Sequence, residues 1–479
     1  MLEKMFKLSE NKTNVRTELI AGLTTFMTMA YIIALNPNLL TGFGAAGQGL
    51  WNGVFLATCI ASAIGMFCMA FLANKPFCMA PGMGLNSFFA VVVGNIVGLT
   101  GMTYLASFQA ALVIILVEGI LFTILSIFNI REKIVDSIPL GIRLGISPAI
   151  GLMLMNIGLG SNAGIYAEGN GFTTPFFVMR DFFGALTPSV LQTSMGDTGY
   201  AAMILTVATM FIGLFAIIAM AKKGVKGAVL FGMLVASVIY WGGSYLFLDV
   251  NPFASLETAS FLPPFADMAE TTLFKFDFEG FLEIGWFTVI TLIITFCIID
   301  MFDTIGTLVG TASRAGMVDE KGNMPNMKEA LLSDAIGTVA GACTGTSTVT
   351  TFVESAAGVE AGGRTGLTTL VCGILFLACI FIAPVAAIIP PAATSAALIY
   401  VGILMLQGLK NVDFGDMDQL VPVCLMLIAM PVSGSIGHGI GLGLVAYTII
   451  KMFSGKFKDV SILTYVISLI FLVKFFLAV

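Results

Sequence analysis

The chain has 479 residues, of which 58% are hydrophobic and only 10% are charged, with a formal net charge of −6. This composition excludes an ordinary soluble domain. We therefore predict an all-α polytopic membrane protein in the cell (plasma) membrane. Runs of apolar residues long enough to cross roughly 30 Å of hydrocarbon lie at 17–40, 53–73, 106–128, 138–160, 201–221, 227–247, 286–310, 366–388 and 391–409.

Shorter or Gly- and Pro-interrupted segments bring the total to about fourteen transmembrane segments. They lie at 76–98, 328–343, 345–360, 419–433 and 435–453. A last apolar stretch at 460–479 is either an extra span or a helix at the interface. The polar first sixteen residues lead into an apolar run too long for a signal-peptide core, so no cleavage is expected. The eight cysteines lack metal-ligand spacing and are interpreted as buried small hydrophobes, so neither a metal nor a cofactor is expected.

The distribution of Lys and Arg predicts the orientation. Basic residues recur at every second connection: Lys4, Lys7, Lys12 and Arg16; Lys75; Arg131, Lys133 and Arg143; Lys222, Lys223 and Lys226; Arg314, Lys321 and Lys328; Arg364; Lys410. The positive-inside rule makes these connections and the N-terminus (1–16) cytoplasmic, and the acidic connection at 251–285 extracellular. The rule also holds for Lys451, Lys456 and Lys458 if 419–433 and 435–453 are half-length helices that enter the membrane and return to the cytoplasmic side.

Two internal echoes indicate an inverted repeat. Ile138-Pro139, followed at a fixed spacing by 151–156, is matched by Ile389-Pro390 followed by 402–407, and both runs end on an amide, Asn156 or Gln407. Ala63-Ile64-Gly65 is similarly matched by 335–337. Seven spans separate equivalent points, and an odd number implies opposite orientation, as in inverted-repeat secondary transporters.

Two interrupted segments are expected to form short strands. Prolines and glycines at 75–86 prevent a continuous helix before about Met83, and the β-branched run at 344–354 favours extended backbone before a helix resumes near Glu354. Extended backbone at membrane depth needs partners for its N–H and C=O groups. We therefore expect one strand from each repeat to pair with the other.

Carboxylates stand close to these breaks. Asp300 and Asp303 share one helical face and Glu354 begins the resumed helix; each intramembrane carboxylate costs on the order of 2.5–3.5 kcal/mol, so three are not expected to be idle. The alternative is that Asp300 and Asp303 are hydrated near the cytoplasmic end of their span, or that Asp300 is purely structural. Nearby hydroxyls favour a polar site and belong to Thr304, Thr307, Thr350 and Thr351. Acids without basic neighbours suit a neutral ligand with several N–H donors better than a small anion, and the same acids can carry a proton.

Four motifs, at 17–37, 81–86, 302–308 and 350–358, resemble the hypoxanthine/guanine/adenine permease branch of the xanthine/uracil permease (nucleobase-cation symporter) superfamily. The resemblance implies fourteen segments in two inverted repeats of seven, a core of segments 1–4 and 8–11, a gate of segments 5–7 and 12–14, proton-coupled purine uptake and a homodimer. In this chain the core is 17–128 and 286–388, and the gate is 129–250 and 389–479, which includes the C-terminal apolar helix.

The resemblance also implies which residues bind the base. Asp303 and Glu354 match the two acids of the family, backbone near Phe352 and Val353 completes the site, and Asn86 matches a polar position of the purine branch. Asp300, Thr304 and Thr307 are expected to assist or to couple the proton.

The chain departs from the pattern of the uracil permeases. Thr307 stands where uracil-type members carry a histidine, and Asp303 is one methylene shorter than their Glu, which leaves room for a bicyclic purine. Met83, Phe88 and Phe352 either stack on the ring or pack in the core. The lone His438 is either structural or a proton relay.

The sequence thus predicts an alternating-access importer of purine nucleobases driven by protons, embedded in lipid, with no enzymatic activity and no nucleic-acid partner. A xanthine or uracil permease, and an anion transporter of the same fold, are the alternatives. An intramembrane aspartyl protease is disfavoured because no Gly-x-Gly-Asp motif is present.

Overall fold

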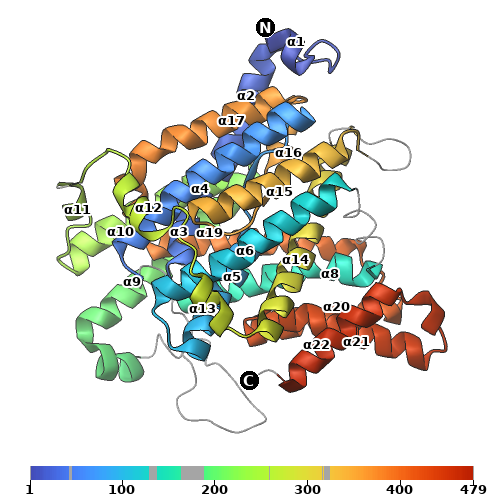
Figure 1. Ribbon diagram of the computed structural model, residues 1–479. Coiled ribbons are helices and arrows are strands. Elements are labelled where there is room, and N and C mark those ends of the chain that lie inside the picture. Colours follow the sequence, from blue (N-terminus) through green and yellow to red (C-terminus); the bar gives the residue numbers. More distant parts are fainter. Residues whose placement is uncertain are drawn as a thin grey trace.

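The computed structural model describes residues 2–42, 46–128, 138–162, 188–257, 259–314, 317 and 324–477. For 161–162, 188–198, 309–310, 313–314 and 477 it describes the backbone alone. The chain is mostly helical (Figure 1), and 11 helical stretches among the described residues are long and apolar enough to cross a membrane. The predicted Arg131, Lys133 and Lys321, and the loops around them, lie outside the described residues.

Among the described residues, the first half contains ten main elements and two short π-helical turns. These are α1 (Leu2–Phe6), α2 (Val15–Met29), α3 (Ile32–Leu40), α4 (Gln48–Cys68) continued by Met69–Ala73, β1 (Met79–Pro81), α5 (Met83–Thr100), α6 (Tyr104–Ile127), α8 (Leu140–Ile157) continued by Gly158–Asn162, α9 (Pro188–Lys222) and α10 (Ala228–Phe247).

The second half begins with three short helices, α11 (Ala254–Glu257), α12 (Phe265–Thr271) and α13 (Phe278–Glu283). The remaining elements are α14 (Trp286–Arg314), α15 (Met327–Thr344), β2 (Val349–Thr351), α16 (Ser355–Glu360), α17 (Gly366–Ala378), α18 (Ala383–Ala387), α19 (Pro391–Met405), α20 (Met417–Ser433), α21 (Ile436–Phe453) and α22 (Ile462–Leu477).

Helices from the two halves of the chain pack against each other. Figure 1 shows α4, α15 and α6 side by side across the middle of the molecule, and α17 packs on α2 and α4. A second group joins α8 with α19 and α20, and α19 with α9 and α10. The first half therefore does not form a unit of its own, because its helices are buried by those of the second half.

The residues of the two sequence echoes meet in space. A Cβ on Gly402 would lie 2.5 Å from the carbonyl oxygen of Gly151, and one on Gly151 would lie 2.6 Å from the carbonyl oxygen of Gly402. A Cβ on Gly337 would similarly lie 3.4 Å from the Cα of Gly65. Glycine is needed where α8 crosses α19, because any side chain there would collide with the opposite backbone.

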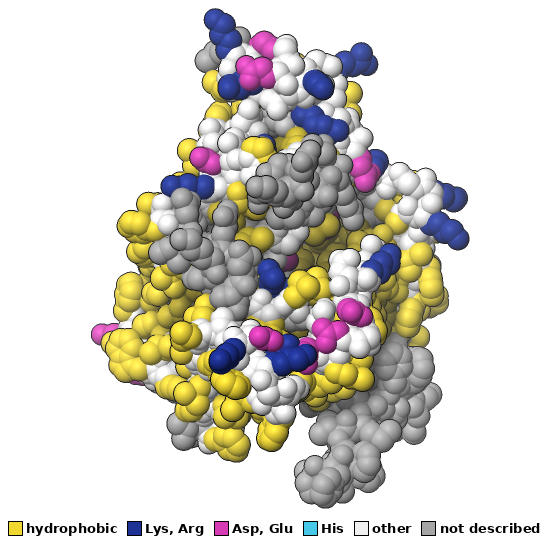
Figure 2. Space-filling view, turned by 90° about the vertical axis from the view of Figure 1, so that its right-hand side faces the viewer, with side chains coloured by type: hydrophobic (Ala, Val, Ile, Leu, Met, Phe, Trp, Pro, Cys, Tyr) yellow, Lys and Arg dark blue, Asp and Glu magenta, His cyan; other side chains and the backbone are white. Residues whose placement is uncertain are grey.

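The connections that the sequence predicts to be cytoplasmic lie together. The Asn74 side chain donates to the carbonyl of Phe6 and accepts from the N–H of Gly366, at 3.0 and 2.8 Å. Lys226 forms an ion pair with Glu360, with 3.1 Å between Nζ and Oε2. Figure 2 shows Lys and Arg side chains spread over one face of the molecule, from its top downward.

The acidic connection lies at another part of the molecule. Asn52 of α4 donates to Asp267, Gln109 of α6 donates to the carbonyl of Thr271 at 2.9 Å, and the N–H of Phe274 donates to the carbonyl of Cys343. Residues 267–274 therefore cover the ends of α4, α6 and α15 that are opposite the clustered basic connections.

The pair α20 and α21 corrects one expectation. The helices are joined by a turn at Gly434, which has a φ of +62°, and Lys451 pairs with Asp418, so the pair returns to the end where it starts. Each helix has 17 or 18 residues, about 26 Å, and is longer than the predicted half-length. Pro431 lies inside the last turn of α20, which ends at Ser433, where the predicted segment also ends.

The last apolar stretch, α22, lies antiparallel along α21. Thr448 and Ser468 share a hydrogen bond of 2.9 Å, and the rings of His438 and Phe475 are 6.0 Å apart. Phe471 is fully buried. The packing along α21 favours an extra membrane helix over one lying flat at the interface.

Candidate substrate site

Two short strands, β1 and β2, pair with each other in the interior, as the sequence predicts. We call the place where they pair the strand crossing. β1 and β2 pair antiparallel, with Ala80 opposite Thr350. Gly82 N–H donates to the carbonyl of Thr348 at 3.1 Å, and Phe352 N–H donates to the carbonyl of Cys78 at 3.0 Å. The pairing supplies the partners that extended backbone needs away from water.

The chain leading into β2 is fixed by side chains from four helices. Each hydroxyl of this run bonds a different polar group: Thr346 with Asn36 of α3 (2.9 Å), Ser347 with Asn86 of α5, Thr348 with Glu118 of α6 (2.8 Å) and Thr350 with Thr304 of α14 (2.7 Å). Of the hydroxyls that the sequence singles out, those of Thr304 and Thr350 bond each other and hold the strand in place.

Glu354 stands just after β2, at the N-cap position of α16. Its side chain does not cap α16. It accepts instead a hydrogen bond of 2.7 Å from the hydroxyl of Tyr31, which lies between α2 and α3. Phe352 is buried, whereas Val353 is 57% exposed, so the chain at the start of α16 is open on one side.

Asp303 lies near the same crossing. It projects from the middle of α14, and its Oδ2 is 3.4 Å from the position that a Cβ on Gly82 would occupy. The charges of Asp303, Glu354 and Asp334 are close enough to interact. The fold thus brings together the two acids that the sequence proposes for the base.

Asp300 belongs to a separate buried network. Thr304 Oγ1 lies 3.1 Å from Asp300 Oδ1, 2.9 Å from Asp334 Oδ1 and 2.7 Å from Thr350 Oγ1. Asp300 is fully buried, so the hydrated interpretation of this residue is wrong. The helix continues beyond the predicted 310 to Arg314, which leaves Asp300 in the middle of the span.

The other predicted residues have varied surroundings. Asn86 donates to the carbonyl of Pro81 at 3.0 Å and accepts from Ser347, so both ends of its amide hold the strand crossing. Phe88 packs on Phe296 with ring centroids 4.6 Å apart, as expected of a core side chain. Thr307 is buried one turn beyond Asp303.

The two amides of the longer echo have different surroundings. Asn156 donates to the carbonyl of Pro431 at 3.1 Å, whereas Gln407 is exposed.

Four further residues were missed by the sequence reasoning. Glu118 is the single charged residue of the run 106–128, and Asp334 is an acid inside 328–343. A charge within a membrane segment would have marked both residues as candidates. Tyr31 gives no such signal, because it is an aromatic residue in an apolar run. Tyr400 of α19 lies within electrostatic range of Glu354, so a helix of the second packing group reaches the site.

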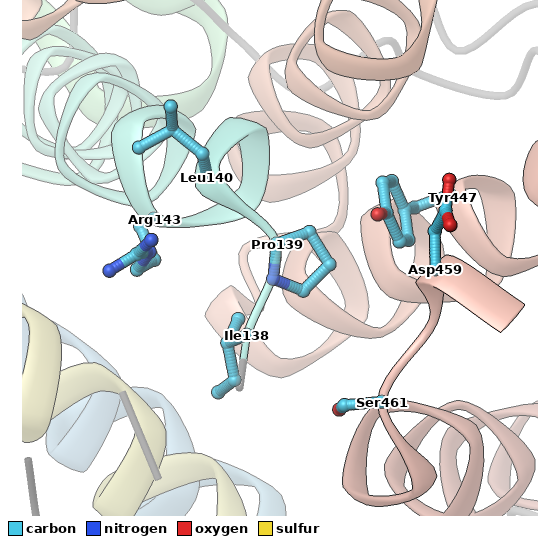
Figure 3. A pocket seen from close by; sticks show the side chains of 7 residues that line it. All are labelled: Ile138, Pro139, Leu140, Arg143, Tyr447, Asp459 and Ser461. Carbon is cyan, nitrogen blue, oxygen red and sulfur yellow. The ribbon is translucent and has the colours of Figure 1, made fainter. Parts of the chain in front are cut away.

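A cavity of about 240 Å³ lies elsewhere, at the start of α8 (Figure 3). It is lined by Ile138, Pro139, Leu140, Arg143, Tyr447, Asp459 and Ser461. In Figure 3, Tyr447 and Asp459 lie on one side of Pro139, and the side chains of Leu140 and Arg143 lie on the other. None of the residues predicted for the base lines this cavity.

Comparison with solved structures places the fold among membrane transporters. The transmembrane domain of a cyanobacterial bicarbonate transporter, BicA, superimposes with a TM-score of 0.61 at 16% identity, over 88% of this chain and 97% of that one. Murine Slc26a9, an anion transporter in the inward-facing state, gives a TM-score of 0.59 at 12% identity, over 92% and 68%. At these identities the likeness concerns the fold alone.

Sequence comparison is more specific. The adenine permease AdeP of Escherichia coli is 37% identical, over 99% of this chain and 96% of its own length. The guanine/hypoxanthine permease PbuO of Bacillus subtilis is 34% identical, over 99% and 100%. A model described as "Permease family", built on xanthine/uracil permeases, matches residues 16–433. The chain is therefore a multi-pass membrane protein and a transporter rather than an enzyme, and it belongs to the xanthine/uracil permease family.

Proposed function

We propose that this protein imports purine nucleobases together with protons, by alternating access. The observation that carries the proposal is the meeting of Asp303 and Glu354 beside the strand crossing, with Glu354 held by a neutral hydroxyl. The adenine and guanine/hypoxanthine permeases among its relatives support purines as substrates.

The proposed site is rich in acceptors. The segments 286–310 and 344–360, which carry the two acids, contain no Lys or Arg. Ionised carboxylates only accept hydrogen bonds, and a purine base presents several N–H donors along its edges. Asp303 and Glu354 would bind those donors, with backbone near Phe352 and the exposed Val353 completing the contact. Asn86 would keep the strand crossing in the shape that this requires.

The network around Thr304 supports proton coupling. The Thr304 hydroxyl has one proton to donate, yet two carboxylates and the Thr350 hydroxyl lie within hydrogen-bond distance of it. That one proton cannot serve both carboxylates at once, and neither Asp300 nor Asp334 can donate to the hydroxyl while it is ionised. All three contacts are satisfied when one acid is protonated and donates to Thr304, which donates to the other acid. We propose that this network holds the coupled proton, next to the base.

The proposed architecture is fourteen segments in two inverted repeats, with the N-terminus in the cytoplasm of a cell whose plasma membrane the protein spans. The contacts between echo glycines support the repeat. We assign 17–128 and 286–388 to the core and 129–250 and 389–479 to the gate, and the two packing groups of helices support this division. Tyr400 of the gate lies within electrostatic range of Glu354 of the core, which supports a site between the two, as alternating access requires. We also propose a homodimer, by likeness to the family.

An anion transporter is the second candidate, because the fold is shared with BicA and Slc26a9. The proposed site disfavours an anion as substrate. It is formed by two acids whose segments contain no basic residue, and ionised carboxylates repel an anion. Within the family, a xanthine or uracil substrate is the remaining alternative.

Uptake measurements test the proposal. Cells lacking their own base permeases and expressing the protein should accumulate labelled adenine, guanine or hypoxanthine, but not bicarbonate, and a protonophore should stop uptake. Glu354→Gln should lower uptake at least tenfold, because the amide offers one acceptor where the carboxylate offers two. Glu283→Gln, the same exchange at an exposed position in α13, is the matched control and should leave uptake unchanged. Bicarbonate or uracil uptake without purine uptake would contradict the purine assignment.

A further inference from the structure

Tyr31 occupies an unusual place in the fold. It lies at the break between α2 and α3, and its side chain is 1% exposed. Its hydroxyl donates to Glu354 Oε1 at 2.7 Å, although the two residues are 323 positions apart. Tyr31 therefore joins the first membrane segment to the broken segment that carries a proposed base-binding acid.

This hydrogen bond is the main restraint on the Glu354 side chain. In the part of the chain that the structure describes, no second side chain bonds the Glu354 carboxylate, and the carboxylate does not cap α16. A glutamate side chain has three rotatable bonds, whose freedom must be lost when it binds a ligand in one orientation. A bond that fixes the carboxylate beforehand lowers this cost.

The chemical type of the partner also matters. An arginine would bind both carboxylate oxygens and neutralise their charge. A tyrosine hydroxyl donates one hydrogen bond to one oxygen and carries no charge. It therefore holds Oε1 while Oε2 keeps its capacity to accept from an N–H of the base.

We propose that Tyr31 is a positioning residue, which fixes Glu354 Oε1 so that Oε2 is presented to the base. The inference rests on the proposed function as far as the base is concerned, but the hydrogen bond itself can be tested without transport.

The first test is Tyr31→Phe, which removes only the hydroxyl. It should raise the KM for base uptake about tenfold, which corresponds to the loss of one hydrogen bond to a charged group, and leave the maximal rate within about twofold. Tyr104→Phe is the matched control, because the Tyr104 hydroxyl donates to the backbone carbonyl of Leu40 at 2.8 Å, away from the site. Its KM should equal that of the wild type. Equal KM values for Tyr31→Phe and wild type would overturn the proposal.

The second test is infrared spectroscopy of the purified protein. The carboxylate band that Glu354→Gln abolishes should shift in Tyr31→Phe and stay in place in Tyr104→Phe. An unshifted band would overturn the proposal whatever is transported. A shifted band in a protein that moves no purine would refute the proposed function and leave the positioning of Glu354 standing. If Tyr31→Phe does not accumulate in cells, the reverse comparison can be made. The tyrosine C–O band of the wild type should then shift in Glu354→Gln, and a band that stays in place would overturn the proposal.

Discussion

Thr304 shows how a single hydroxyl can organise several buried charges. It touches Asp300, Asp334 and Thr350, which come from α14, α15 and β2. An apolar residue of similar shape would leave two buried carboxylates without their common partner, and leaving a buried polar group unsatisfied costs about 1–3 kcal/mol.

The residue-scale prediction follows from this geometry. Thr304→Val should lower the thermal midpoint of the purified protein and reduce base uptake at least tenfold, whereas Thr304→Ser, which keeps the hydroxyl, should retain both. Unfolding in detergent followed by fluorescence, together with uptake in cells, measures the two effects. Normal proton-coupled uptake by Thr304→Val would rule out the network as the proton carrier.

At the scale of elements, the close approach of α8 and α19 depends on glycine. The backbones touch at Gly151 and Gly402, where no side chain fits. The contact joins the two halves of the chain at equivalent positions of the longer sequence echo. A similar approach of α4 and α15 occurs at Gly65 and Gly337.

Gly402→Ala should destabilise the protein by about 1–3 kcal/mol, because the added methyl overpacks the contact with α8. The control is Gly94→Ala in α5, where a Cβ meets nothing within 4 Å. That change should be neutral or stabilise by up to about 1 kcal/mol, because alanine favours the helix. Equal thermal midpoints for the two variants would show that α8 and α19 do not approach as closely as described.

Another element-scale link joins α2 to α17. The buried Glu18 carboxylate accepts from the N–H groups of Arg364, Thr365 and Thr368, and from the Thr368 hydroxyl at 2.6 Å. A carboxylate at the start of a helix satisfies N–H groups that have no partner within the helix. Not every intramembrane acid of this chain therefore belongs to the substrate site.

At the scale of the whole molecule, the charged connections separate into two sets. Basic connections cluster around the first residues, and the acidic connection covers another part of the structure. The positive-inside rule converts this separation into an orientation.

Cysteine labelling checks that orientation. In intact cells, a membrane-impermeant maleimide should label Glu270→Cys but not Lys12→Cys, and permeabilised cells should show both. Both positions are exposed. The unmodified protein with its eight native cysteines is the control. Labelling of Lys12→Cys in intact cells would place the N-terminus outside.

The backbone around the candidate site could be predicted from the sequence, because it depends on the conformational preferences of a few neighbouring residues. Pro81 and Gly82 keep the helix from starting before Met83, and β-branched residues extend the chain before Glu354; both boundaries are found where expected. The acids themselves were identifiable because a charge in an apolar run is costly wherever the run lies.

The partners of these acids could not be predicted in the same way. Tyr31 and Glu354 are joined only because α2, which ends just before Tyr31, packs against α16, and Asp334 reaches Thr304 only because α15 lies beside α14. The hydroxyls of Thr304 and Thr350 looked like ligand groups in the sequence, yet they bond each other and anchor the strand.

The sequence by itself determined the membrane class, the breaks in two segments and the presence of carboxylates in or beside apolar segments, because composition, backbone preference and the cost of a buried charge act over a few residues. The tertiary structure alone decided which groups those acids contact. Such contacts depend on distances between segments hundreds of residues apart, which are fixed by packing and by the pairing of two strands.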